Sequence, residues 1–319
     1  ASTQTFHTIR YLVDKDRVAD AYRAYAYFRW VDDSLDAGSG FALTSCPQGS
    51  GGARSHLSSP ADEAAERGAF VERQRSLLEK CYRGEAPRDT DIHEQMLVEL
   101  IRNDHEKNSG LQTYLRNMMG VMVFDASRRG WLISQVELNE YTRLLASAVT
   151  EAMHYFIGHC CYSPHDEARY LAVSAAHITH MLRDTFDDVQ AGYYNIPREV
   201  LDANHISPQD VGSKAYRTWV KSRVQLARTY FNAGRDYLSR VQNPRCRLAG
   251  FAYTARFEWL LDTFERENYS LRPQYEERKR FGTGVRMMAS AFASMMNWRG
   301  AELGHVIARG ASPEAISRE

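Results

Sequence analysis

The chain has 319 residues, of which 44% are hydrophobic and 25% charged, as in an ordinary globular protein of one large or two smaller domains. Forty basic and forty acidic side chains cancel, so no overall positive field favours nucleic acid as a partner. No apolar run approaches the roughly 20 residues of a membrane-spanning helix, although contact with a membrane surface stays open.

The five cysteines show no zinc-ligand spacing and suggest no disulfide framework. The sequence also starts without the charged and apolar regions of a signal peptide. Together these features predict a reducing, cytoplasmic location, with peripheral membrane association left open.

Glycine and proline cluster between long segments and rarely inside them, which predicts an almost wholly helical chain. The Gly- and Ser-rich segment at about 37–60 is expected to form a long, mobile loop. Helices are expected at about 16–36, 61–82, 90–106, 136–159, 164–190 and 208–241. Further helices are expected to begin near Leu111, to run from the "QNPR" break to about Glu267, and to fill much of 282–308. No linker divides the chain, so residues 1–319 are predicted to form a single all-α bundle of roughly eight to ten helices.

Two pairs of aspartates stand out within these helices. Asp32 and Asp36 are four residues apart, and so are Asp184 and Asp188, so each pair projects from one side of its helix. Like charges at this spacing repel, and burying them costs more still unless a cation is supplied. Mg²⁺ prefers such hard oxygen ligands and shares its coordination with water and substrate phosphate. Two facing pairs would therefore hold several Mg²⁺ ions around one diphosphate.

Carboxylate pairs at this spacing are also common on solvated helix faces, so the neighbouring residues matter. Tyr25 and Arg29 fall on the face of the first pair, and Arg183 adjoins the second. His177 and His180 project on the face of the second pair. Basic, aromatic and imidazole groups beside both pairs favour a functional site, and Asp125, after a Met-rich run, is a weaker candidate for it.

At these residues the chain resembles the squalene/phytoene synthase family, the head-to-head prenyl synthases that include dehydrosqualene synthases. The stretch "YAYFRWVDDSLD" (25–36) resembles the first aspartate-rich motif of the family, and "HMLRDTFDDVQAGYYNIP" (180–197) resembles the second. "YTRLLASAVTE" (141–151) resembles its Y-x-x-x-x-A-G-x-V-G helix, and "ENYSLRPQYEERKR" (267–280) its basic C-terminal segment. The resemblance implies an isoprenoid-synthase helical bundle with a central cavity.

The resemblance also implies a role for individual residues. The Mg²⁺ ligands would be Asp32, Asp36, Asp184 and Asp188. Tyr25 and Tyr141 would lie near the reacting carbons. Substrate contacts would come from Arg29, Arg183, His180, Thr3, Thr5, Arg272, Arg278 and Lys279.

Several positions depart from the family pattern. His180 stands where the family usually has Asn, and in the usual G-R-x-Y-x-P turn Tyr193 replaces the Arg and Asn195 the Tyr. Tyr cannot replace the bidentate phosphate contact of an arginine. Ser147 and Thr150 replace two helix glycines and make the helix wall bulkier. These changes suggest a different product or substrate, or a divergent reaction.

The first functional hypothesis is a Mg²⁺-dependent prenyltransferase that condenses two farnesyl or geranylgeranyl diphosphates head to head and releases diphosphate, with a squalene/phytoene-type product. Use of NADPH stays open, because the sequence shows no site for it. A second hypothesis is a class I terpene synthase that ionises and cyclises a single prenyl diphosphate. A third is a non-catalytic family member that acts as an assembly or interaction protein.

Overall fold

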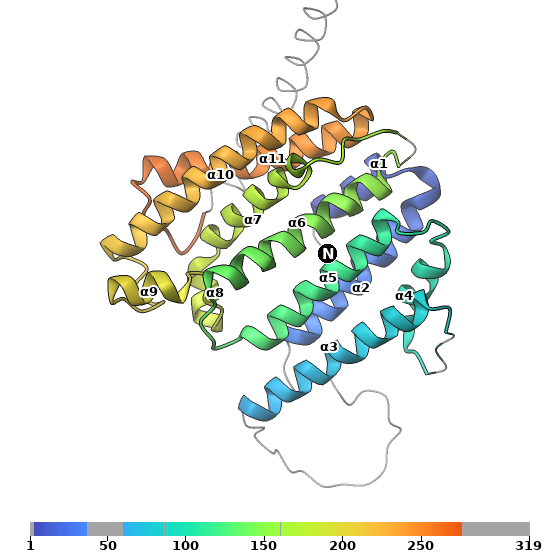
Figure 1. Cartoon of the computed structure of the whole chain (residues 1–319), viewed down its shortest axis with the longest axis horizontal. Coiled ribbons are helices and arrows are strands. Elements are labelled where there is room, and N and C mark those ends of the chain that lie inside the picture. The colour runs from blue at the N-terminus through green and yellow to red at the C-terminus, as the bar shows by residue number, and fades with distance from the viewer. Residues whose placement is uncertain (1–2, 37–59, 86, 88, 160, 276–319) are drawn as a thin grey trace, which may run out of the picture.

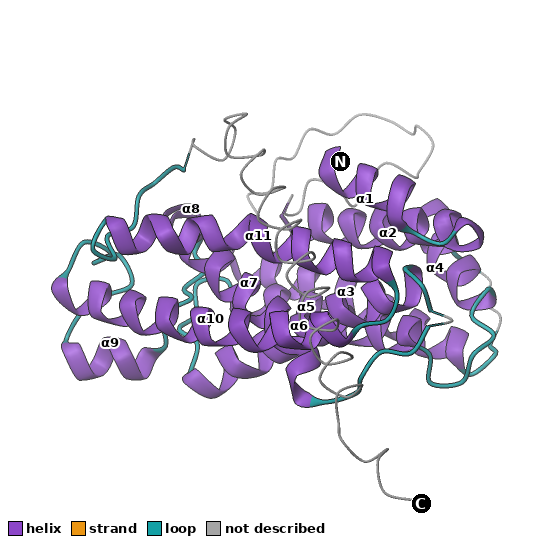
Figure 2. Ribbon diagram, turned by 90° about the horizontal axis from the view of Figure 1, so that it is seen from above, coloured by secondary structure: helices purple, strands orange, loops and turns teal. Residues whose placement is uncertain are grey.

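The computed structural model describes residues 3–36, 60–85, 87, 89–159 and 161–275. Within these residues every named element is a helix and no β-strand is present, so the predicted all-α class is confirmed (Figure 2). Most of the predicted loop at 37–60 and all of the predicted helix at 282–308 lie outside the described residues. The prediction of a single domain over 1–319 stays a prediction.

The described residues of the first half of the chain form six α-helices and one short 3₁₀ turn. They are α1 (Thr3–Leu12), the 3₁₀ turn Lys15–Arg17, α2 (Val18–Asp36), α3 (Pro60–Tyr82), α4 (Ile92–Arg102), α5 (Gly110–Arg128) and α6 (Gln135–Phe156). Two of these helices begin where capping boxes form, at Asp91 with Glu94 and at Ser134 with Glu137. Helix α1 was not among the predicted elements.

Up to residue 275, where the described part ends, the second half forms a 3₁₀ turn and five helices: Glu167–Tyr170, α7 (Leu171–Arg183), α8 (Thr185–Ala191), α9 (Arg198–Asn204), α10 (Lys214–Arg240) and α11 (Pro244–Arg266). The predicted single helix at 164–190 is wrong, because the backbone at Asp184 leaves the helical region (φ −94°, ψ 6°) and separates α7 from α8. The helix predicted from Pro208 begins only at Lys214, where the Ser213 hydroxyl caps it by accepting from the Tyr216 amide at 3.1 Å.

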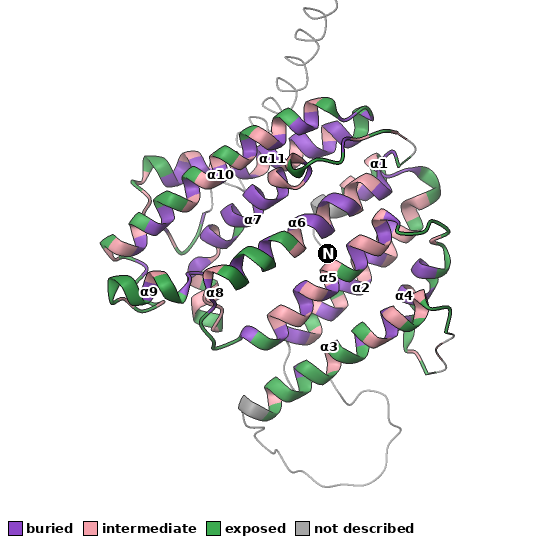
Figure 3. Cartoon of the chain, viewed as in Figure 1, coloured by how far each residue is buried: buried purple, intermediate pink, exposed green. Residues whose placement is uncertain are grey.

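The helices pack into two hydrophobic clusters that meet along α6 and α7. One cluster is built mainly from α2 to α6, and the other from α7, α10 and α11 (Figure 1). The apolar faces of the helices turn toward one another, while exposed residues follow the outer faces of α3, α6 and α9 (Figure 3). None of the described helices combines the length and the apolar character that crossing a bilayer requires.

The segment after α5 is tied to the segment after α8. Leu132 and Tyr194 form an isolated parallel bridge, and the Gly130 amide donates to the Gly192 carbonyl at 2.8 Å. Gly130 and Gly192 have φ values of 82° and 86°, which favour glycine. These contacts bring the C-terminal end of α5 beside the residues that follow the second aspartate motif.

Candidate functional site

The two aspartate motifs, separated by about 150 residues in the sequence, line one cavity of about 250 Å³. Asp32 and Asp36 come from the last turns of α2, while Asp184 lies at the break between α7 and α8 and Asp188 within α8. We call this space the acidic cavity. Its lining consists of Asp32, Leu35, Asp36, Asp125, Arg128, Tyr141, His177, His180, Met181, Asp184, Asp188, Tyr193 and Asn195.

The two aspartates of the second motif have opposite electrostatic environments. Burial opposes ionisation of Asp184, but hydrogen bonds from His180 (3.0 Å) and Arg183 outweigh it and lower the pKa of Asp184 well below its usual value. Burial and the charge of Asp184 raise the pKa of Asp188 to about 7, although the Asn195 amide donates to Asp188 at 2.7 Å. Asp184 is thus paired with basic side chains, whereas the charge of Arg128 only partly offsets the burial of Asp188.

The first motif is only partly compensated by its neighbour on α2. Arg29 donates to Asp32 at 3.1 Å but also pairs with Asp33, and its side chain is about half exposed. Burial, followed by the charge of Asp36, raises the pKa of Asp32. The first pair, like the second, therefore carries negative charge that no neighbouring side chain fully balances.

Tyr25 is not among the residues that line the acidic cavity, and its predicted place near the reacting carbons stays a prediction. Together with Arg29 and Trp30 it lines a separate groove of about 600 Å³ between α1, α2 and α4. Tyr25 precedes Asp32 by seven residues, which on a helix is a displacement of about 10 Å along the axis. Tyr25 and Asp32 therefore lie on the same face of α2 but line different cavities.

Tyr141 lies in the cavity wall, where its place in the sequence motif suggested. Its side chain is buried, and its hydroxyl donates to Asp125 Oδ2 at 3.0 Å. Its ring stacks on Phe124 with 4.8 Å between centroids and meets the His177 ring edge-on at 5.0 Å. The motif carboxylates therefore share their cavity with the rings of Tyr141 and His177.

Arg128 is a cavity residue that the sequence analysis missed. It is buried, and it donates from Nε to Asp125 and from Nη1 to the Asn195 side-chain oxygen, both at 2.8 Å. Its guanidinium lies 4.9 Å from the ring centroids of both Tyr141 and Tyr193. Arg128 thus brings a cation beside Tyr193, at the turn where the family motif usually has its arginine. No local sequence pattern predicts a site role for Arg128, because the bridge at Leu132, a contact between distant segments, brings the end of α5 to this turn.

The other residues predicted to contact substrate either lie away from the acidic cavity or fall outside the described part of the chain. Arg272 pairs with Glu267 at 2.9 Å and lies over the Tyr275 ring at 4.8 Å. Thr3 and Thr5 lie in α1, which packs against α2 and α11, but their side chains are outside the described part. Arg278 and Lys279 also lie outside the described residues.

The chemistry of the cavity fits Mg²⁺ better than a metal held by protein alone. Among the described histidine, cysteine, aspartate and glutamate side chains, no three converge closely enough to hold a metal ion. Mg²⁺ usually takes one or two carboxylates and completes its octahedron with water and substrate phosphate. The raised pKa values of Asp32 and Asp188 mark negative charge that such a cation would offset.

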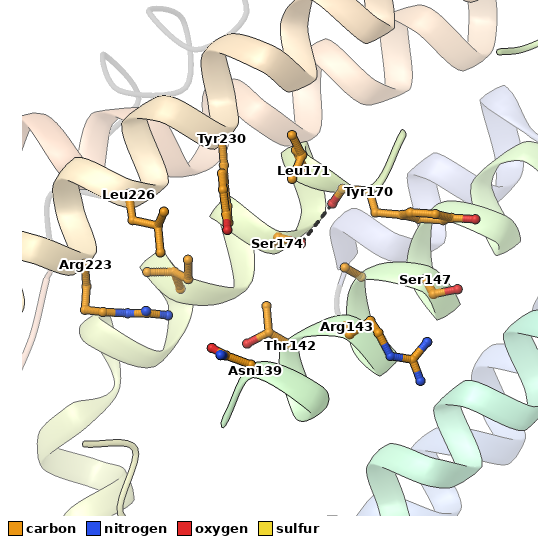
Figure 4. A pocket seen from close by; sticks show the side chains of 12 residues that line it. Asn139, Thr142, Arg143, Ser147, Tyr170, Leu171, Ser174, Arg223, Leu226 and Tyr230 are labelled. Carbon is orange, nitrogen blue, oxygen red and sulfur yellow. Dashed lines mark hydrogen bonds between the residues drawn. The ribbon is translucent and has the colours of Figure 1, made fainter. Parts of the chain in front are cut away.

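A second cavity, of about 590 Å³, lies between α6, α7 and α10 and contains none of the motif aspartates. Figure 4 shows Arg223 reaching from α10 toward Asn139 on α6, with Leu226 and Tyr230 along the same wall. Burial lowers the pKa of Arg223. Without a carboxylate in its lining, this cavity offers no magnesium ligands of its own.

The chain is similar in sequence to a protein of known function. A 15-cis-phytoene synthase of Synechocystis sp. is 31% identical over 114 residues, which cover 34% of this chain and 33% of that protein. The chain thus matches about a third of the length of this curated relative.

Two solved structures have the same fold. Squalene synthase HpnC of Alicyclobacillus acidocaldarius is 18% identical with a TM-score of 0.58, over 85% of this chain and 91% of that chain. A dehydrosqualene synthase in complex with ligand is 14% identical with a TM-score of 0.66, over 93% of both chains. These likenesses confirm the isoprenoid-synthase helical fold. Because residues 1–281 match the squalene/phytoene synthase family, the chain belongs to that family.

Proposed function

We propose that this protein is a Mg²⁺-dependent prenyltransferase that joins two prenyl diphosphates head to head and releases diphosphate. The observation that carries the proposal is the meeting of four motif aspartates, from α2 and from α7–α8, in one cavity beside aromatic rings. The names of the related phytoene, squalene and dehydrosqualene synthases support coupling of two substrates.

Asp32, Asp36, Asp184 and Asp188 would hold the metal, which when bound supplies positive charge against a departing diphosphate. His180 and Arg183 already donate to Asp184 and fix its carboxylate within the cavity wall. The same organisation orients the anionic end of a substrate before reaction.

Aromatic rings in the cavity would stabilise the carbocation that remains after diphosphate has left. When diphosphate leaves an allylic carbon, the positive charge that remains is attracted to the faces of aromatic rings. Tyr141 lines the cavity together with the carboxylates, and it is held in place by stacking on Phe124 and by its bond to Asp125. Because Tyr141 is buried, its part of the wall also keeps water from the cation.

The substrates in this proposal are farnesyl or geranylgeranyl diphosphate, with a squalene- or phytoene-type product. We place the enzyme in the cytoplasm. Because such substrates are partly apolar, the enzyme would take them up either in solution or from a membrane surface. A rival activity is cyclisation of one prenyl diphosphate, and its support is the departure from the family pattern at Thr150 and in the turn that holds Tyr193 and Asn195.

The test is incubation of the purified chain with each diphosphate, with and without Mg²⁺ and with and without NADPH, followed by mass analysis of the extracted products. We expect a Mg²⁺-dependent hydrocarbon with twice the carbon count of the substrate. A cyclic product of unchanged carbon count would favour the rival activity. Absence of diphosphate release at every chain length would favour a non-catalytic interaction protein.

A further inference from the structure

His177 of α7 is a cavity residue whose ring nitrogens have no hydrogen-bond partner among the described residues. The side chain is only 5% exposed, and neither ring nitrogen has a hydrogen-bond partner among the described residues. It belongs to the lining of the acidic cavity and meets the Tyr141 ring edge-on at 5.0 Å. Buried polar groups in folded proteins are nearly always paired, so an unpaired ring on a cavity wall points to a partner that arrives with the substrate.

The surroundings keep this ring neutral. Burial, followed by the positive charges of His180, Arg128 and Arg223, lowers the pKa of His177 to about 3. A neutral imidazole carries one N–H group and one free lone pair. His177 can therefore accept a proton at any pH at which the protein would normally work.

We infer that His177 is the base that ends the reaction, by taking a proton from the carbocation that remains after the two chains have been joined and both diphosphates have left. This inference rests on the proposed function. It makes the product a hydrocarbon whose formation ends with loss of a proton, without a reductant. His177 is then a catalytic residue rather than a packing residue of α7.

The step balances without a further reagent. A C–H bond next to the cationic carbon breaks, its electron pair becomes the new carbon–carbon double bond, and the imidazole lone pair binds the proton. Nothing is oxidised or reduced. The imidazolium then passes its proton to the diphosphate already released in the same cavity, since a buried, positively surrounded imidazolium is a strong acid.

A weak base is adequate for this proton. A C–H bond beside a carbocation is far more acidic than an imidazolium, so transfer to a base of low pKa is still downhill. Position matters more than strength, and the ring of Tyr141, which lines the same cavity and lies 5.0 Å from the His177 ring, would hold the cation beside His177. The same burial excludes water, which would otherwise trap the cation as an alcohol.

The test compares His177→Phe and His177→Gln with the wild-type chain. Phe keeps a planar ring without nitrogen, whereas Gln keeps hydrogen-bonding capacity without basicity. His154→Gln serves as the control, because His154 is a largely buried histidine of α6 that lies outside the acidic cavity. Each protein is incubated with Mg²⁺ and farnesyl or geranylgeranyl diphosphate, and diphosphate release, the ratio of coupled hydrocarbon to alcohol, and thermal stability are measured.

For both His177 variants we expect diphosphate release close to that of the wild type and a hydrocarbon-to-alcohol ratio lower by about 100-fold, the usual contribution of a general base. The melting temperature should not fall, because no bond to another described residue is lost. His154→Gln should leave the ratio unchanged.

An unchanged ratio in His177→Phe, or a wild-type ratio in His177→Gln, would overturn the inference. So would loss of diphosphate release in step with hydrocarbon, which would place His177 in ionisation or binding. A wild-type chain whose only coupled product is reduced and depends on NADPH would also overturn it, while leaving the proposed coupling intact. A wild-type chain that releases no diphosphate would instead show that the proposed function has failed.

Discussion

Asp187 and Asp188 are adjacent aspartates with different surroundings. Asp188 lines the acidic cavity, is bonded by Asn195, and has a pKa raised to about 7, whereas Asp187 is exposed and is not part of the lining. Position in the fold, and not residue type, separates a candidate metal ligand from a surface charge.

This contrast gives a matched test. Asp184→Ala or Asp188→Ala should lower Mg²⁺-dependent diphosphate release by about a thousandfold, because each removes a carboxylate from the metal site. Asp187→Ala should leave turnover within about twofold, since exposed substitutions rarely matter. Steady-state kinetics measures diphosphate release by each variant, and circular dichroism checks that each variant is folded. Full activity of Asp184→Ala would show that Asp184 is not an essential metal ligand.

Arg128 and Arg129 form a second matched pair. Arg128 bridges Asp125 and Asn195 inside the protein, whereas Arg129 is exposed and donates to the Ala191 carbonyl at 3.1 Å. Lysine keeps the charge but cannot bond two partners in a fixed planar geometry. We expect Arg128→Lys to cost about 1–3 kcal/mol of unfolding free energy and to lower kcat/KM by about tenfold or more.

Arg129→Lys should change neither quantity appreciably. Urea denaturation and steady-state kinetics on both variants provide the measurement. If the two lysine variants behaved alike, Arg128 would have no special part in organising the cavity.

At the scale of elements, the close packing of α10 on α7 is set by one glycine. A Cβ placed on Gly234 would lie 2.7 Å from the backbone nitrogen of Ala172, a contact that no side-chain rotation can relieve. Gly68 in α3 is also helical but exposed, and nothing lies within 4 Å of its Cβ position. The two glycines therefore differ in packing while sharing the same backbone conformation.

Gly234→Ala should accordingly destabilise the protein by about 1–3 kcal/mol, because the helices must move apart. Gly68→Ala should instead stabilise it by about 0.5–1 kcal/mol, through the higher helix propensity of alanine. Chemical denaturation of both variants measures this. A stabilised Gly234→Ala variant would mean that α7 and α10 are less tightly packed than described.

At the scale of the whole molecule, His154 joins three helices. From α6 its ring meets the Tyr237 hydroxyl of α10 at 2.9 Å and the Cys246 sulfur of α11 at 3.5 Å. Burial, followed by the charge of Arg169, lowers the pKa of His154 to about 4. The folded state therefore binds the His154 proton less readily than the unfolded chain does.

A histidine whose pKa is depressed on folding stabilises the protein above its unfolded pKa, near 6.5, and this stability is lost as pH falls toward 4. We expect the wild type to lose on the order of 2 kcal/mol of unfolding free energy over this window on account of His154. His154→Gln should show a correspondingly shallower pH dependence between pH 7 and 4.5 in urea denaturation. Equal slopes for the two proteins would contradict this assignment.

The sequence by itself determined the helical class and both aspartate motifs, because helix periodicity and four-residue spacing are local properties of the chain. It also pointed to Tyr141, through the motif on α6. It did not give the break at Asp184, where no glycine or proline interrupts the pattern and only tertiary packing divides α7 from α8.

Only the tertiary structure decided which residues meet. Arg128 reaches Asn195 across 67 residues because the bridge at Leu132 ties two connections together, and Tyr25 is removed from the cavity by its height along α2. Local spacing fixes the direction of a side chain on its own helix. Neighbours on other helices, and with them the charge, burial and pKa of each group, depend on contacts between segments that are distant in the sequence.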